Sequence, residues 1–215
     1  MRRFAPGDWA GRSVLLVAPH PDDEAFGCGG TAHLLAKAGA RVQVVVAGSG
    51  HGGVGGAASP DEREDESRRA CELLGTLPPV FLRLSSPTLR DDPAAAGRAL
   101  AAAVGASPCA LVLVPSPLER HRTHQATLLA ALCAGLPGDG AWWGYGVWDA
   151  LPAVDDVAEI DVTEARSAKT LAMSAYASQN RVRSLAAAMA ARDMAQATFS
   201  RFTGDEPRRA VERLL

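Results

Sequence analysis

The stretch VLLVAPHPDDEAFGCGG, residues 14–30, joins an apolar run to a dense group of histidine and carboxylate side chains. The apolar part, residues 14–18, is typical of a strand that is buried on both faces, as strands of parallel sheets are. The glycines at its end open a segment with helical composition over residues 29–38, and residues 41–47 then form a second strand-like run. This order of elements predicts a βαβ unit.

The same alternation of strand-like and helical segments continues along the chain. We predict further strands over residues 80–84, 110–114 and 158–162, and helices over residues 60–74, 93–104, 124–134, 166–177 and 184–199. Residues 141–148 form an aromatic stretch interrupted by glycine, and residues 48–59 a glycine-rich loop. Residues 201–215 are expected to form a solvated amphipathic helix suited to oligomerisation. The alternation favours a three-layer, Rossmann-like α/β fold with a mainly parallel sheet, in a single domain over residues 1–215.

Composition narrows the possible classes of function. The formal net charge is -2, and arginines are interspersed with acidic residues, so the chain lacks the basic stripe that nucleic acid requires. We expect a cytoplasmic protein without a membrane span, because no apolar segment follows the basic start and no uncharged stretch reaches spanning length. The four cysteines are far apart, which favours buried, reduced thiols over a thiolate metal site or disulfides.

A second chemical cluster, HRTH at residues 121–124, follows the apolar run ALVLV at residues 110–114. Open parallel sheets place their active sites at the carboxyl ends of the strands, so the two clusters are expected to meet there. A hydrolytic zinc ion takes three nitrogen or oxygen ligands and one water, whose pKa it lowers to about 7. His20, Asp23 and His124 supply such a set, and we predict a metal site.

Two neighbouring side chains have roles beside a metal. Asp22 is placed to act as general base toward a water molecule, and His121 to donate a proton to the leaving amine or to stabilise an oxyanion. Glu24 is expected to be a hydrogen-bonding group behind the ligands. Each residue alone is more commonly part of a solvated turn or a hydrogen-bonded core, but their crowding at two strand ends favours a catalytic site.

These residues also resemble a known signature. APHPDDE at residues 18–24, followed by GCGGT at residues 27–31, is similar to the motif of the PIG-L/LmbE-like N-acetylglucosaminyl deacetylases. Further matching positions extend the resemblance as far as residue 179: Arg63, Glu66, Glu119, Lys169, Tyr176, Ser178 and Gln179. The resemblance thus covers most of the chain.

The resemblance implies a fold, a reaction and a set of roles. The fold is that of the family, and the reaction is zinc-dependent removal of an acetyl group from an N-acetylglucosamine-type sugar conjugate, a small molecule, which releases acetate and a free amine. The resemblance implies that the zinc ligands are His20, Asp23 and His124. It further implies that Asp22 is the general base, that His121 is the acid or the group that stabilises the oxyanion, and that Arg63 faces the substrate. Fe²⁺ is a second possible metal, because imidazole and carboxylate ligands also accept it.

Departures from the family pattern keep two alternatives open. The second cluster of the family usually reads His-Pro-Asp-His, so Arg122 and Thr123 remove a carboxylate that would orient His121. Ser85 and Ser86 stand where relatives often carry an acidic residue. The alternatives are an amidase for another small-molecule amide, such as a thiol conjugate, and a non-catalytic relative that binds a sugar or a metal.

Two local patterns have simpler explanations. Gly27-x-Gly29-x-x-Ala32 fits a dinucleotide fingerprint only loosely, because the metal motif separates it from the strand, so we expect helix packing and no such cofactor. Arg63 and Glu66 are spaced to form a pair within one helix.

Overall fold

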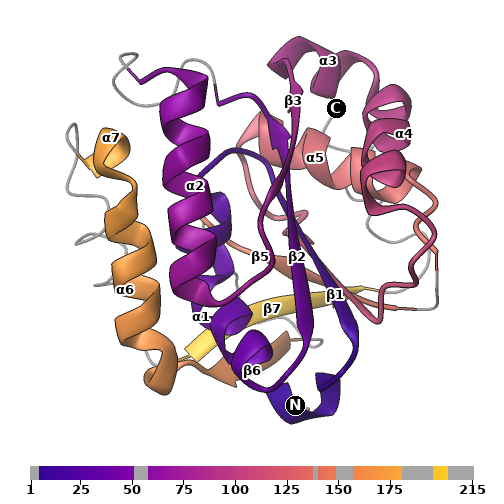
Figure 1. Ribbon diagram of the computed structural model, residues 1–215. Helices are drawn as coiled ribbons and strands as arrows, with labels where there is room; N and C mark the ends of the chain where they lie inside the picture. Colours follow the sequence, from indigo (N-terminus) through magenta and orange to yellow (C-terminus); the bar gives the residue numbers. More distant parts are fainter. Residues whose placement is uncertain (1–4, 51–57, 138–139, 149–156, 181–195, 203–215) are drawn as a thin grey trace.

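The computed structural model describes residues 5–50, 58–137, 140–148, 157–180 and 196–202 (Figure 1). The strands are β1 (Ser13–Ala18), β2 (Arg41–Gly48), β3 (Val80–Leu84), β4 (Leu111–Pro115), β5 (Ala141–Tyr145), β6 (Val157–Asp161) and β7 (Gln196–Phe202). The α-helices are α1 (Asp23–Lys37), α2 (Pro60–Leu74), α3 (Ser86–Asp91), α4 (Pro93–Val104), α5 (Arg122–Cys133), α6 (Arg166–Ala175) and α7 (Ala177–Asn180). Two 3-10 turns are η1 (Pro6–Trp9) and η2 (Thr163–Ala165).

One sheet organises the molecule, with the strand order β3-β2-β1-β4-β5-β7-β6. Strands β1 to β5 pair in parallel, and β7 runs antiparallel to both β5 and β6. The central strand β1 has the apolar composition that burial on both faces requires, and Leu16, Val17 and Ala18 are completely buried. The predicted mainly parallel α/β sheet is confirmed.

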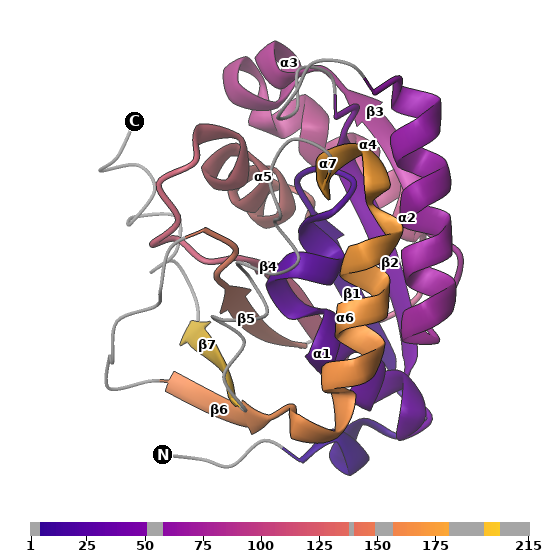
Figure 2. The same cartoon turned by 90° about the vertical axis from the view of Figure 1, so that its left-hand side faces the viewer.

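Helices cover both faces of this sheet. Helices α1, α2 and α6 pack together on one face, and α3, α4 and α5 on the other, as the two views in Figures 1 and 2 show. Separate apolar clusters fill the two interfaces between the sheet and its helices. Among the described helices, none combines the length and the apolar character that crossing a bilayer requires.

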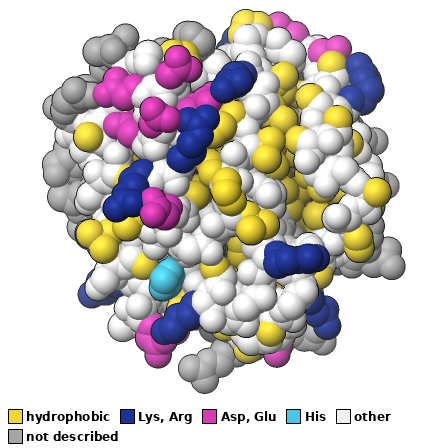
Figure 3. Space-filling view, in the orientation of Figure 1, with side chains coloured by type: hydrophobic (Ala, Val, Ile, Leu, Met, Phe, Trp, Pro, Cys, Tyr) yellow, Lys and Arg dark blue, Asp and Glu magenta, His cyan; other side chains and the backbone are white. Residues whose placement is uncertain are grey.

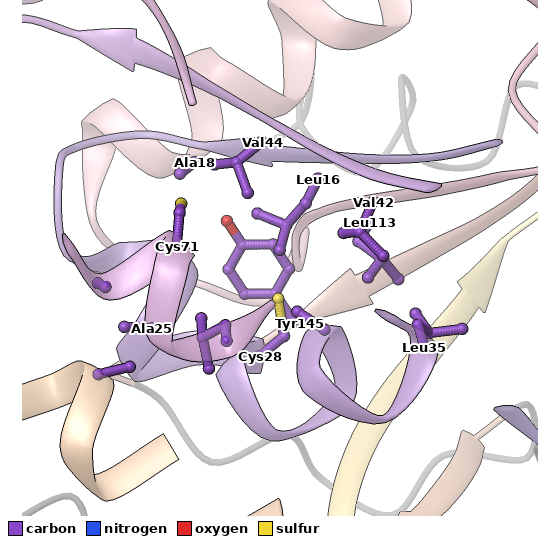
Figure 4. Close-up of a cluster of buried hydrophobic side chains, with 14 of the residues drawn as sticks. Leu16, Ala18, Ala25, Cys28, Leu35, Val42, Val44, Cys71, Leu113 and Tyr145 are labelled. Carbon is purple, nitrogen blue, oxygen red and sulfur yellow. The ribbon is translucent and has the colours of Figure 1, made fainter. Parts of the chain in front are cut away.

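Tyr145, at the end of β5, occupies the centre of the larger cluster (Figure 4). Its hydroxyl donates a hydrogen bond to the Val17 carbonyl of β1 at 2.7 Å. A Cβ at Gly27 in α1 would lie only 2.6 Å from the tyrosine ring, and a Cβ at Gly30 would lie 3.1 Å from Val162. The glycines of α1 therefore permit close packing, as expected.

The predicted element boundaries differ from the structure in several places. Helix α1 begins at Asp23 rather than Gly29, α5 begins at Arg122 rather than His124, and α3 was not predicted. The helix predicted over residues 184–199 is wrong at residues 196–199, because this segment pairs with β5 and β6 as strand β7. Most of the glycine-rich loop and nearly all of the predicted tail lie outside the described residues.

Helix α2 shows how local sequence sets its two ends. The hydroxyl of Ser59 accepts the Glu62 amide N–H at 3.1 Å, and Pro60 occupies the first turn. Gly75 ends the helix with a φ of 74°, a conformation that glycine adopts at little cost.

Figure 3 shows charged side chains over α2 and hydrophobic ones over β3 and α4.

Candidate metal centre

The candidate site lies past the carboxyl ends of β1 and β4, which are neighbours in the sheet. The chain builds β2 and β3 on one side of β1, and β4 and β5 on the other, so the order of strands reverses between β1 and β4. Open α/β sheets bind ligands at this switch point because the loops after the two strands diverge and leave a crevice. The structure therefore brings the two histidine-containing clusters together where the sequence predicts.

Asp23 contacts both of the other predicted metal ligands. Its Oδ2 atom lies 3.0 Å from His20 Nδ1 and 3.3 Å from His124 Nε2. The His20 amide N–H also donates to this oxygen at 3.0 Å. One possible ligand atom from each of the three residues lies within 4.8 Å of the other two, which is close enough for all three to bind one ion.

His124 is fully buried and is oriented from behind by Glu119. Its Nδ1 lies 3.0 Å from Glu119 Oε2, so Nδ1–H is the donor and Nε2 is left facing Asp23. Nε2 has no properly directed hydrogen bond to any described residue. A buried imidazole nitrogen without a hydrogen-bond partner, backed by a carboxylate, is the arrangement of a metal ligand, so the residues fit a divalent ion.

The electrostatics of the ligands also suit a cation. Burial alone would raise the pKa of Asp23, but the two imidazoles outweigh it and the pKa is lowered. Burial alone would lower the pKa of His124, yet Asp23 and Glu119 raise it to about 10. Positive charge is thus favoured at His124, and a metal ion can take the place of the proton there.

Asp22 adjoins Asp23 but faces a different partner. Its Oδ2 accepts a hydrogen bond from Arg63 Nη2 at 2.9 Å, and its side chain is 13% exposed. Burial, followed by the charge of Asp23, raises the pKa of Asp22 well above its usual value, although Arg63 opposes this. A carboxylate with a raised pKa beside a candidate metal site is suited to accept a proton.

Arg63 is buried and engaged within the protein. Besides Asp22, its guanidinium donates to the carbonyl oxygens of Gly50 at 2.7 Å and Pro21 at 2.6 Å. Glu66 accepts hydrogen bonds from Ser178 instead, so both members of the pair expected within α2 contact residues outside this helix. A contact of Arg63 with substrate stays a prediction.

His121 lies at the N-cap of α5 with an exposed side chain. Its ring centroid is 4.6 Å from that of His124 and 5.4 Å from that of His20. Burial of part of the ring and then the two neighbouring imidazoles lower its pKa. A neutral imidazole at this place is better suited to donate a hydrogen bond than to act as a strong acid.

The two departures from the family pattern have different structural settings. Thr123 is buried in α5, and its carbonyl accepts a hydrogen bond from the Thr127 hydroxyl at 2.8 Å. Ser85 caps α3, where its hydroxyl accepts the Thr88 amide N–H at 3.1 Å. Ser85 therefore has a structural role at the start of α3.

Glu119 has a role in the site that its sequence pattern does not predict. Its Oε1 accepts the amide N–H groups of Val147 at 2.6 Å and Trp148 at 3.1 Å, while Oε2 holds His124. Its place among the positions that resemble the family and its proximity in sequence to His124 were the available signals, because the contacts to the segment after β5 depend on the fold. Glu119 thus links a candidate ligand to the wall of the site.

Known proteins that are similar to this chain include one curated protein and two solved structures. The Escherichia coli K12 protein described as uncharacterized deacetylase YaiS is 32% identical over 74 residues, a match spanning 34% of this chain and 38% of that protein. N,N'-diacetylchitobiose deacetylase from Pyrococcus horikoshii superposes with a TM-score of 0.64 at 21% identity, over 89% of this chain and 84% of that one. The 4-carboxy-2-hydroxymuconate hydratase GalB of Pseudomonas putida KT2440 superposes with a TM-score of 0.63 at 18% identity, over 90% and 97%.

The two superpositions establish the fold, which carries both a deacetylase and a hydratase, so they do not choose the reaction. The family comparison is more specific. Residues 15–134, more than half of the chain, match the family described as PIG-L, GlcNAc-PI de-N-acetylase. The chain belongs to the PIG-L family.

Proposed function

We propose that the protein is a metal-dependent hydrolase that removes the acetyl group from an N-acetylated amino sugar conjugate. The observation that carries this proposal is the convergence of His20, Asp23 and His124 beside Asp22, a carboxylate turned away from the ligand set. The de-N-acetylase description of the family supports the same reaction. The bond broken is the amide C–N bond; the carbonyl supplies one oxygen of acetate, and water supplies the other oxygen and protons for the amine.

The expected metal is Zn²⁺, with Fe²⁺ as the second possibility, because two imidazoles and one carboxylate suit both. When bound, the ion supplies Lewis acidity, which polarises an amide carbonyl and lowers the pKa of water. His20, Asp23 and His124 would hold it, and Glu119 would keep His124 in the required tautomer.

The other side chains move protons and stabilise charge. Asp22 would take a proton from the attacking water, while Arg63 holds one of its oxygens and so fixes the direction of the carboxylate. His121 would donate a hydrogen bond to the oxygen that becomes negative as the carbonyl is attacked. The proton held by Asp22 then passes to the leaving nitrogen, and acetate and the amine are released.

A substrate panel tests the proposal. Purified protein is stripped of metal, reconstituted with Zn²⁺ or Fe²⁺, and assayed for amine and acetate release from N-acetylglucosamine, free or linked to inositol, malate or lipid. We expect metal-dependent, equimolar release of both products from at least one conjugate. Release only from other amides, such as thiol conjugates, would identify the amidase alternative, and metal binding without hydrolysis of any amide would identify a non-catalytic binder.

Two histidine variants provide matched controls. His20→Ala removes a proposed ligand and is expected to abolish metal-dependent release. His33→Asn removes a histidine whose Nδ1 lies 3.1 Å from the Leu74 carbonyl, away from the site, and is expected to leave release unchanged. Activity in His20→Ala equal to that of His33→Asn would contradict the proposed ligand set.

A further inference from the structure

Two consecutive carboxylates in the site point in different directions. Asp23 faces His20 and His124, whereas Asp22 faces Arg63. The backbone of Asp22 makes this divergence possible, with a φ of 133° and a ψ of -33°. Residues other than glycine rarely adopt such a positive φ, and this conformation persists only where the surrounding structure holds it.

Glu24 supplies a direct hold on this turn. Its Oε2 accepts the amide N–H of Asp22 at 3.0 Å. Its other oxygen, Oε1, accepts the Ser67 hydroxyl of α2 at 2.9 Å and the Tyr176 hydroxyl just after α6. The Glu24 side chain has no exposed surface, so these donors from three separate parts of the fold fix both carboxylate oxygens.

We infer that Glu24 is a positioning residue whose carboxylate holds the Asp22 peptide in its positive-φ turn and keeps the proposed base apart from the metal ligands. This inference rests on the proposed function for its catalytic consequence. Only an acceptor can satisfy the Asp22 N–H, since this group always donates. The Ser67 and Tyr176 hydroxyls, by contrast, can rotate and either donate or accept.

This asymmetry makes the substitutions informative. Glu24→Gln keeps one oxygen for the Asp22 N–H, and its amide group can donate to the two hydroxyls, so the turn is expected to survive. Glu24→Met has similar length but no oxygen to accept the N–H, and its thioether sulfur is only a weak acceptor. The double variant Ser67→Ala/Tyr176→Phe removes the same two hydroxyl contacts as Glu24→Met but retains the contact between Glu24 and Asp22.

The test measures five quantities on the full-length protein loaded with Zn²⁺. These are the melting temperature, the zinc affinity by chelator competition, kcat and KM on the substrate found in the panel, and hydrogen exchange of the Asp22 amide by NMR. We expect Glu24→Met to lower kcat about 10- to 100-fold with KM and zinc affinity within about threefold of wild type. The Asp22 amide should lose its protection in Glu24→Met and keep it in Glu24→Gln and in the double variant.

A purely structural role would lower the melting temperature equally in Glu24→Met and in the double variant, with equal effects on kcat, and that result would overturn the inference. Protection of the Asp22 amide retained in Glu24→Met would overturn it as well. If Glu24→Met does not fold, Glu24→Asp replaces it, because its carboxylate is one methylene too short to reach both sides. If the wild type hydrolyses nothing, the proposed function fails, while amide exchange still decides the role of Glu24.

Discussion

Residue by residue, the site shows how two adjacent aspartates acquire different properties. Burial favours the neutral form of both Asp22 and Asp23. In Asp23 the charges and hydrogen bonds of two imidazoles dominate, so its pKa is lowered, while in Asp22 burial and the neighbouring Asp23 outweigh Arg63. Environments that push the pKa values of two carboxylates apart are a feature of sites that need one fixed anion and one proton acceptor.

Asp22→Asn tests the proposed base. The amide retains an oxygen for Arg63 but cannot accept a proton, so kcat should fall about 100- to 10,000-fold while zinc remains bound. Steady-state kinetics and zinc analysis of the purified variant measure both quantities. A kcat within threefold of wild type would contradict the assignment of Asp22 as base.

Glu119→Gln tests the support of His124. An amide oxygen can still accept from Val147 and Trp148, but the amide nitrogen then faces the donor Nδ1–H of His124. The zinc affinity should fall about 10- to 100-fold, as measured by chelator competition. Glu64→Gln, which alters a buried carboxylate outside the site, should leave the affinity unchanged; an equal loss in both variants would show a general effect of charge.

The identities of the proposed ligands follow from the sequence, because both clusters come directly after apolar strands and strand ends meet at one edge of a parallel sheet. The contacts that support these ligands do not follow from the sequence. Glu119 contacts the segment after β5, 28 positions away, and Glu24 contacts Tyr176, 152 positions away, and such pairs form only when the chain folds. The predicted pair of Arg63 with Glu66 was wrong for the same reason, because Arg63 contacts Asp22, 41 positions away.

At the scale of single elements, apolar runs in the sequence predict the strands well. The starts of the helices are predicted less well. Five apolar residues in succession can be buried only in the middle of the sheet, which is where β1 and β4 lie. The start of α1 was placed six residues late because the turn at Asp22 begins the helix inside the metal motif. Strand β7 was missed because its pairing with β5 joins distant parts of the chain.

Gly75→Ala tests the end of α2. A Cβ there would meet only Ala36 at 3.8 Å, so the cost comes from the positive φ rather than from a clash. We expect a loss of about 1 kcal/mol in the free energy of unfolding, measured by urea denaturation. Gly7→Ala, at a glycine with open space and no positive φ, should have no such effect. Equal stabilities of the two variants would refute this explanation of the helix end.

The ion pair between α2 and β3 predicts a pH dependence. Arg83 adopts a φ of 53°, beside a register shift between β2 and β3, and donates to Glu64 at 2.6 and 2.8 Å. These hydrogen bonds lower the pKa of Glu64, so the pair stabilises the protein above the unfolded-state value of about 4.3 and loses its effect as pH falls through the folded pKa.

Glu64→Gln, which also removes the pair with Arg68, should therefore reduce the free energy of unfolding at pH 7 by no more than about 1 kcal/mol, because Arg83 and Arg68 are 62% and 48% exposed and water screens both pairs. Urea denaturation at successively lower pH should show the difference between variant and wild type shrinking. A difference that grows in acid would mean that the pair acts with the opposite sign.

For the molecule as a whole, the candidate ligands join segments that are a hundred residues apart. His20 and Asp23 follow β1, and His124 belongs to α5, which packs on the other face of the sheet from α1. Zinc at about 100 times its dissociation constant should add about 2.7 kcal/mol of stability, which corresponds to a rise of roughly 5–10 °C in melting temperature for a chain of this size.

Thermal denaturation with and without zinc measures this rise. It should disappear in His124→Ala and persist in His33→Asn, whose absolute melting temperature is free to change. A zinc-dependent rise of the same size in both variants would place the bound ion elsewhere.

The place of β7 in the sheet bears on how the protein is made. Strand β7, near the C-terminal end of the chain, lies between β5 and β6, although β6 precedes it by some forty residues. While the chain emerges from the ribosome, β6 therefore has no neighbour to pair with until residues 196–202 have left the exit tunnel. Chains that stop before this segment should keep the β1–β5 layer yet expose an open strand edge, which is the surface that chaperones and proteases engage.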